Sequence, residues 1–168
     1  MRDKLRVCFA FITMALLSPV SAAKGIDLHW LWDDRCAECH GHAGEFARNF
    51  LNISGGQLQG RHYVYDLHRF MQNHYLMESE VDEVYNMLLA QASIEPRFSR
   101  ACSSCHGTAV NLMRNSLDLH NGVLYSRKYQ SPVRQFLKGH MGLSPGDAEF
   151  FTGLLTRVAH EVYRVRLE

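Results

Sequence analysis

Two segments show the apolar spacing of an amphipathic helix. In residues 84–89 and 150–158 the hydrophobic side chains recur at intervals of three and four, which places them on one side of a helix. A hydroxyl residue with a carboxylate three positions later precedes each segment, in Ser79–Asp82 and Ser144–Asp147. This is the pattern of a capping box, so we expect helices to begin there, with Pro145 in the first turn of the second one.

Shorter helices are expected at residues 25–35, 63–74 and 132–139. Turns are expected at Gly55-Gly56 and Asn121-Gly122, because glycine and asparagine favour turn conformations. No segment alternates polar and apolar residues over a useful length, so we expect no significant sheet. The predicted fold class is therefore all-α.

The chain repeats itself when Cys36 is aligned with Cys102. Without a gap, residues 36–92 then align with residues 102–158, and 17 of the 57 positions are identical. A chance alignment of this composition gives about three or four identities, so the repeat indicates two copies of one unit. We expect one domain at residues 24–96 and a second at residues 97–168.

Residues 1–23 have the features of a secretory signal peptide. Arg2, Lys4 and Arg6 precede an apolar run at positions 7–17, and small residues follow at positions 18–23. The run is shorter than the roughly 20 residues that span a bilayer. We expect cleavage after residue 22 or 23, a periplasmic location and no transmembrane segment in the mature chain.

The net charge and composition of the chain limit the classes of molecule that it is expected to bind. The formal net charge of the 168-residue chain is +1 and 46% of its residues are hydrophobic. A globular chain without a basic excess is not expected to bind nucleic acid. The sequence gives no indication of the oligomeric state.

The motif C-x-x-C-H occurs twice, at residues 36–40 and 102–106, and is the attachment signature of c-type haem. Two thiols on one turn of chain form thioethers to the haem vinyl groups, and the adjacent imidazole is the proximal ligand of the iron. The predicted thioether residues are Cys36, Cys39, Cys102 and Cys105, and the predicted proximal ligands are His40 and His106.

A zinc site and a thioredoxin-like redox pair are the alternatives. Zinc would not need a histidine after each cysteine pair, and a redox motif would not recur in one chain. Of the five cysteines, Cys8 lies in the predicted signal peptide and the other four lie in the two motifs. We therefore expect two covalently bound haem c groups and no structural disulfide.

Each copy contains a helix, the motif, a loop and a capped closing helix. This order of elements resembles a small class I cytochrome c. The tandem arrangement is similar to the dihaem cytochromes of the cytochrome c4 type. Besides the motifs, the resemblance rests on the glycines that follow them, on the segment Leu58-Gln59-Gly60-Arg61 and on the capped helices. It implies two tandem helical haem domains that serve electron transfer.

The chain departs from that family at the distal ligand. The family usually supplies a methionine before the closing helix, but no methionine superposes when the two copies are aligned. Instead His74 and His140 superpose, so each follows its proximal histidine at the same spacing. They are the predicted distal ligands, with Met71 or Met77 as rivals in the first copy and Met141 as the alternative in the second.

Arg61, Tyr63, Arg127 and Tyr129 recur in both copies and are candidate partners of the haem propionates, because guanidinium and phenol groups suit carboxylates. Ordinary surface packing is the alternative explanation for these four.

Coordination by two histidines gives a lower reduction potential than histidine with methionine, and it leaves no open position for a substrate. We therefore expect a non-enzymatic carrier that transfers single electrons between redox partner proteins. The alternative is a haem enzyme or enzyme subunit that acts on small sulfur or nitrogen oxyanions, which would need a displaceable ligand.

Overall fold

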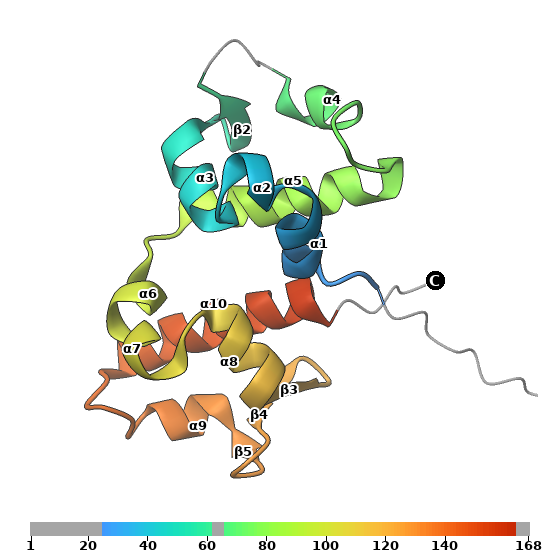
Figure 1. The fold of residues 1–168 in the computed structure, drawn as a ribbon. Helices are drawn as coiled ribbons and strands as arrows, with labels where there is room; N and C mark the ends of the chain where they lie inside the picture. The colour runs from blue at the N-terminus through green and yellow to red at the C-terminus, as the bar shows by residue number, and fades with distance from the viewer. Residues whose placement is uncertain (1–24, 62–65, 164–168) are drawn as a thin grey trace, which may run out of the picture.

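The computed structural model describes residues 25–61 and 66–163. Its elements fall into two successive groups, which we call the first unit (residues 25–93) and the second unit (residues 97–163) (Figure 1). The first unit contains α1 (Leu28–Arg35), α2 (Ala37–His40), α3 (Ala43–Phe50), β1 (Leu51–Ser54), β2 (Gln57–Gly60), α4 (Leu67–Met71) and α5 (Glu78–Ser93). The second contains α6 (Arg97–Ala101), α7 (Ser103–His106), α8 (Ala109–Ser116), β3 (Leu117–His120), β4 (Val123–Ser126), β5 (Ser131–Pro132), α9 (Val133–Leu137) and α10 (Pro145–Val162).

The second unit repeats the elements of the first. The pairs α2 and α7, α3 and α8, β1 and β3, β2 and β4, and α4 and α9 each begin at positions that the sequence repeat aligns. The closing helix α10 begins one position later in the alignment than α5, and β5 has no counterpart among the described residues of the first unit. These paired elements therefore follow one another in the same order in both units.

The expectation of no significant sheet is wrong. In each unit an antiparallel hairpin follows the helix after the motif, with Leu51 paired to Gly60 in the first and Leu117 paired to Ser126 in the second. The described part of the chain is mainly helical, with two small sheets. The two-residue turns at Gly55-Gly56 and Asn121-Gly122 have positive φ at both positions, the conformation of tight hairpin turns.

The three shorter helices that the sequence predicts are found with different bounds. The helix expected at residues 25–35 begins at Leu28, because the Asp27 side chain accepts hydrogen bonds from the first-turn amides. The helix expected at residues 132–139 is α9. The helix expected at residues 63–74 corresponds to α4, which is shorter than expected. Residues 62–65 lie outside the described residues.

The two predicted capping boxes had opposite outcomes. The Ser144 hydroxyl accepts from the Asp147 amide at 3.1 Å, and Pro145 opens α10 as predicted. In the first unit the predicted cap at Ser79 is wrong, because α5 begins one residue before it. There the Met77 amide donates to Glu80 at 2.9 Å.

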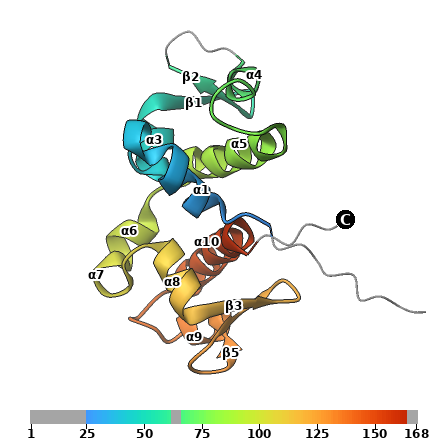
Figure 2. The ribbon, with the colours of Figure 1, turned by 45° about the vertical axis from the view of Figure 1, so that its right-hand side comes forward.

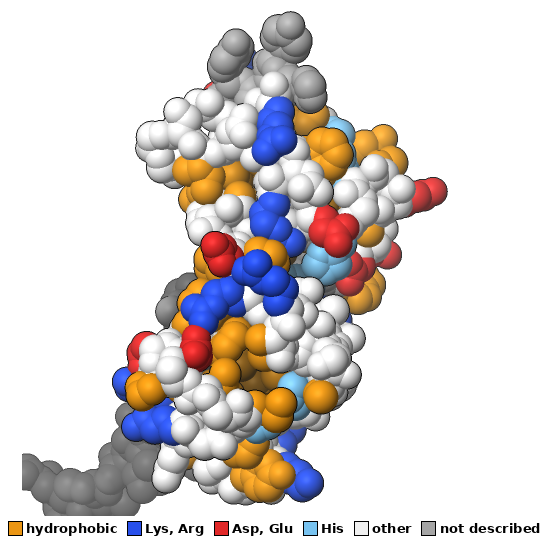
Figure 3. All heavy atoms as spheres, turned by 90° about the vertical axis from the view of Figure 1, so that its left-hand side faces the viewer, with side chains coloured by type: hydrophobic (Ala, Val, Ile, Leu, Met, Phe, Trp, Pro, Cys, Tyr) orange, Lys and Arg blue, Asp and Glu red, His pale blue; other side chains and the backbone are white. Residues whose placement is uncertain are grey.

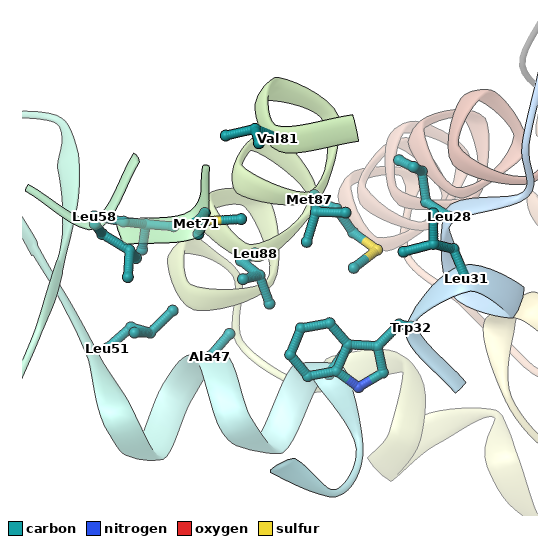
Figure 4. Packing of buried hydrophobic residues seen from close by; sticks show 13 residues of the cluster. Leu28, Leu31, Trp32, Ala47, Leu51, Leu58, Met71, Val81, Met87 and Leu88 are labelled. Carbon is teal, nitrogen blue, oxygen red and sulfur yellow. The ribbon is translucent and has the colours of Figure 1, made fainter. Parts of the chain in front are cut away.

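Each unit has its own hydrophobic core. In the first, Leu31, Leu58 and Met87 are almost completely buried between α1, the hairpin and α5 (Figure 4). In the second, Met113 and Ala159 are fully buried where α8 packs on α10. Burial of each large side chain contributes about 1.5–3 kcal/mol, so α5 and α10 hold their units together mainly through these contacts.

The two units meet where α1 packs on α10, and α1 lies between α5 and α10 (Figures 1 and 2). His29 Nε2 lies 2.7 Å from Glu161 Oε2, and both side chains are buried. Nearby, Arg114 donates to Asp27 Oδ2 at 2.6 and 2.9 Å. A buried polar contact and a partly exposed ion pair thus join the units.

Within the described ranges, no helix combines the length and the apolar character that a membrane span requires.

Candidate functional sites at two histidine pairs

Both C-x-x-C-H motifs fold as a single helical turn directly after a helix. In the first, the Cys36 amide donates to Trp32 O at 2.9 Å, and the His40 amide donates to Cys36 O at 2.9 Å. In the second, Cys102 donates to Phe98 O at 2.9 Å and His106 donates to Cys102 O at 3.0 Å. This turn presents two thiols and one imidazole from five consecutive residues.

The four motif cysteines of the described chain carry free thiols. Cys39 and Cys105 are exposed, whereas Cys36 and Cys102 are partly buried. Burial raises the pKa of the Cys36 thiol, an effect that Arg35 partly opposes, and burial also raises the pKa of the Cys102 thiol. Because none of these four cysteines forms a disulfide in the described chain, their sulfur atoms are free to bind a ligand covalently.

A second histidine lies beside each motif histidine. The ring centroids of His40 and His74 are 5.9 Å apart, and so are those of His106 and His140. The second histidine of each pair follows a short helix, with the His74 amide donating to Met71 O and the His140 amide to Leu137 O, both at 3.1 Å. The structure thus brings together the histidines that the sequence repeat singled out.

The separation within each pair suits two ligands on opposite sides of one metal atom. A metal–imidazole bond is about 2 Å long, so two such bonds together with the two ring radii give centroids roughly 6 Å apart. The ring planes are inclined by 60° in the first pair and by 49° in the second. Ligation of iron by these four histidines remains a prediction.

Exposed aromatic side chains lie beside both histidine pairs. The Phe70 ring is 4.7 Å from His74, and the Phe136 ring is 4.8 Å from His140. These phenylalanines are 45% and 40% exposed, a large fraction for aromatic side chains. A flat apolar cofactor between each histidine pair would cover such a surface.

One face of the second unit is hollowed. Figure 3 shows the hollow lined by hydrophobic side chains, with a histidine at its rim. The apolar lining and the imidazole fit a haem better than they fit a hydrated ion.

The first histidine pair is electrostatically coupled. Burial lowers the pKa of His40, and the proximity of His74 lowers it further. A neutral imidazole is the form that binds a metal.

The predicted methionine rivals lie in different surroundings. Met71 is 5% exposed and belongs to the core of the first unit beside Leu58 (Figure 4). Met77 is 53% exposed and immediately precedes α5, and Met141 is 82% exposed next to His140. Histidine is thus the better placed distal candidate in the first unit, where Met71 serves the core.

Within the described residues, no three side chains of His, Cys, Asp or Glu are grouped so that they could hold a metal ion by themselves. A metal between either histidine pair would need further ligands that these described side chains do not supply. Porphyrin supplies four equatorial nitrogens and leaves two axial positions, which matches a pair of imidazoles. The residues present therefore fit haem.

The candidate propionate arginines hold the hairpins in place. Arg61 donates to Asn52 Oδ1 at 3.3 Å and to Arg48 O at 3.4 Å. Its equivalent Arg127 donates to Asp118 Oδ1 at 2.9 Å and to Arg114 O at 2.7 Å. The hydrogen bond with Asp118 raises the pKa of Arg127 further.

The candidate tyrosines differ in what the structure describes. Tyr63 lies outside the described residues. Tyr129 is exposed and stacks on Phe136 at 5.3 Å, which places it beside the second histidine pair. Contacts of these tyrosines and arginines with propionates remain predictions.

Sequence reasoning missed the phenylalanine neighbours of the histidine pairs. Phe70 and Phe136 could have been found, because they are identical under the repeat and precede His74 and His140 by four residues. The tryptophans at positions 30 and 32 are expected from the sequence to pack against haem or core, and Trp32 is buried in the core beside His40. Phe46, which also lies beside His40, aligns with a leucine in the second unit, so the repeat does not single it out.

A comparison with known protein families, with curated proteins and with solved structures gives no match to this chain.

Proposed function

We propose that the protein is a dihaem c-type cytochrome that carries single electrons between redox partner proteins in the periplasm. One observation carries the proposal: each C-x-x-C-H histidine lies beside a second histidine, at equivalent positions of the two units and at the same separation of 5.9 Å. A haem attachment motif together with a correctly spaced second imidazole supplies every protein ligand that a six-coordinate haem needs.

Each unit would hold one haem. Cys36 and Cys39 would form the thioethers of the first, with His40 and His74 as its axial ligands. The second would be held in the same way by the equivalent residues, Cys102, Cys105, His106 and His140. Haem iron supplies one-electron redox chemistry, which the protein tunes through its axial ligands and the burial of the site.

A carrier fits these residues better than an enzyme does. With His40 and His74, or His106 and His140, holding the haem iron, a substrate would have no free position at the metal. The exposed Phe70 and Phe136 leave one side of each site near the surface, where a partner protein could approach closely. Electron-transfer encounters are brief and small, so the protein needs no extensive docking surface.

Electron paramagnetic resonance of the purified, haem-loaded protein tests the proposal. We expect covalent haem to survive denaturing electrophoresis, at two haems per chain. The wild type should show low-spin ferric signals only. His74→Ala and His140→Ala should each convert one haem to the high-spin form and allow it to bind carbon monoxide, whereas Met141→Leu should leave both haems low-spin.

Three results would count against the proposal. A purified chain without covalently bound haem would contradict the proposal. A low-spin, unshifted haem in either histidine variant would show that this histidine is not the ligand, and loss of a low-spin haem in Met141→Leu would assign methionine instead. Rapid binding of carbon monoxide by the chemically reduced wild type would favour the enzyme alternative.

A further inference from the structure

Trp32 forms a direct link to the first motif. Its indole Nε1 donates to the carbonyl oxygen of Gly41 at 2.9 Å, and the side chain is only 3% exposed. Figure 4 shows the indole extending from α1 into the core of the first unit, above α3. Because Gly41 follows His40 directly, this hydrogen bond fixes the backbone that carries the motif imidazole.

Aromatic rings also lie against one side of the His40 imidazole. The indole centroid of Trp32 lies 6.1 Å from the His40 centroid, and the Phe46 ring lies 4.6 Å from it in an edge-on arrangement. The Trp32 and Phe46 rings are 5.4 Å apart and so contact each other. The motif histidine of the first unit is therefore packed among aromatic side chains on the side of α1 and α3.

The second unit lacks this arrangement. When the two copies are aligned, Phe98 replaces Trp32 and Leu112 replaces Phe46. Phenylalanine has no N–H, and within the described ranges no side chain donates to the carbonyl of Gly107. The Phe98 ring instead contacts Phe151 at 6.4 Å. In this part of the chain the only aromatic ring found beside His106 is that of His140.

We propose that Trp32 is a positioning residue for the His40 imidazole, and that with Phe46 it makes the two haem sites inequivalent, the first having the higher reduction potential. This inference rests on the proposed function. His40 is half-buried beside two aromatic rings, whereas His106 is exposed. Ferric haem carries one more positive charge than ferrous haem, so more apolar surroundings disfavour the ferric form. The hydrogen bond to Gly41 holds the imidazole at one orientation against these rings.

Trp32→Phe removes the donor while keeping an aromatic ring, and it installs the residue that the second unit has. In the holoprotein we expect the low-spin resonance signal of the first haem to shift or broaden, because its imidazole is no longer held at one angle. The signal of the second haem should not change. Trp30→Phe is the matched control, since Trp30 is on the same helix but is 57% exposed. The His74→Ala and His140→Ala variants assign each signal to its haem.

Redox titration tests the second part of the inference. Phe46→Leu should lower the potential of the first haem towards that of the second, and Leu112→Phe should raise the potential of the second. Neither change touches the hydrogen bond, so these variants remain informative if Trp32→Phe folds poorly. A thermal unfolding curve for each variant separates loss of fold from an effect on the haem.

The outcomes distinguish the two proposals. A chain without covalent haem overturns the proposed function. A chain with two haems whose potentials are equal, or whose first signal is unchanged in Trp32→Phe, overturns this inference and leaves the proposed function intact.

Discussion

The glycine that follows each motif histidine occupies a backbone conformation that other residues avoid. Gly41 has φ 66° and ψ −153°, and Gly107 has φ 67° and ψ −131°. A Cβ atom would meet no heavy atom within 4 Å at Gly41, so the restriction comes from the backbone itself. At such dihedral angles any residue with a side chain is strained.

Gly41→Ala should therefore destabilise the protein by about 1–3 kcal/mol, measured as the free energy of unfolding in urea. Gly153→Ala is the control, because Gly153 is exposed within α10 and a Cβ there also meets no atom within 4 Å. Alanine favours a helix interior over glycine, so the control should stabilise by about 0.5–1 kcal/mol. Equal effects of the two changes would contradict the backbone argument.

At the scale of single residues, the histidine pairs could be predicted because the two copies of the repeat can be aligned with each other. His74 and His140 superpose, and the structure puts them at the same distance from His40 and His106. The contacts of Trp32 could not be predicted in this way. They depend on how α1 packs against α3, and the second unit does not share them.

The start of α10 depends on one local hydrogen-bond network. The Ser144 hydroxyl donates to Asp147 and accepts from its amide, and Arg97 also pairs with this carboxylate. The hydrogen bond from Ser144 is the largest cause that holds the pKa of Asp147 below its ordinary value of 3.8, and Arg97 contributes in the same direction. A carboxylate with a lowered pKa stabilises the folded state above its unfolded pKa.

Asp147→Asn should therefore be less stable than the wild type at neutral pH. The difference should shrink as the pH falls below about 3.8 and through the lower folded pKa, because the wild-type carboxylate then becomes protonated too. Thermal unfolding between pH 2 and pH 7 measures this. Ser144→Ala should cost about 0.5–2 kcal/mol at neutral pH. A constant difference between wild type and Asp147→Asn over the whole range would argue against the charge effect.

At the scale of elements, sequence reasoning failed where a contact with a distant residue, and not the local sequence, determines where a helix begins. Ser79 matched the cap pattern, but Glu80 is buried, receives a hydrogen bond from Met77 and pairs with Arg35 at 2.9 Å. That contact with α1 sets the start of α5. The hairpin strands have four residues each, too short for an alternation signal. The Gly-Gly and Asn-Gly turns between them were the available hairpin signal.

At the scale of the whole molecule, the buried contact between α1 and α10 couples the two units. Glu161 is 7% exposed and accepts hydrogen bonds from both sides, since His29 Nε2 lies 2.7 Å from one oxygen and Arg157 Nη1 lies 2.9 Å from the other. Within the described chain the Nε atom of Arg157 is buried and has no hydrogen-bond partner. The guanidinium therefore depends on Glu161 for its charge compensation.

Glu161→Ala should lower the free energy of unfolding by about 3–5 kcal/mol, because it leaves buried polar groups of both units without a partner. In calorimetry we expect the wild type to unfold in one heat-absorption peak and Glu161→Ala in two, since α1 no longer ties the first unit to the second in the variant. The control is Glu149→Ala, which breaks the exposed pair with Arg134 and should cost about 0–1 kcal/mol. If Glu161→Ala instead unfolds in one peak with a loss no larger than that of Glu149→Ala, the His29–Glu161–Arg157 contact does not couple the units, and other contacts between them must do so.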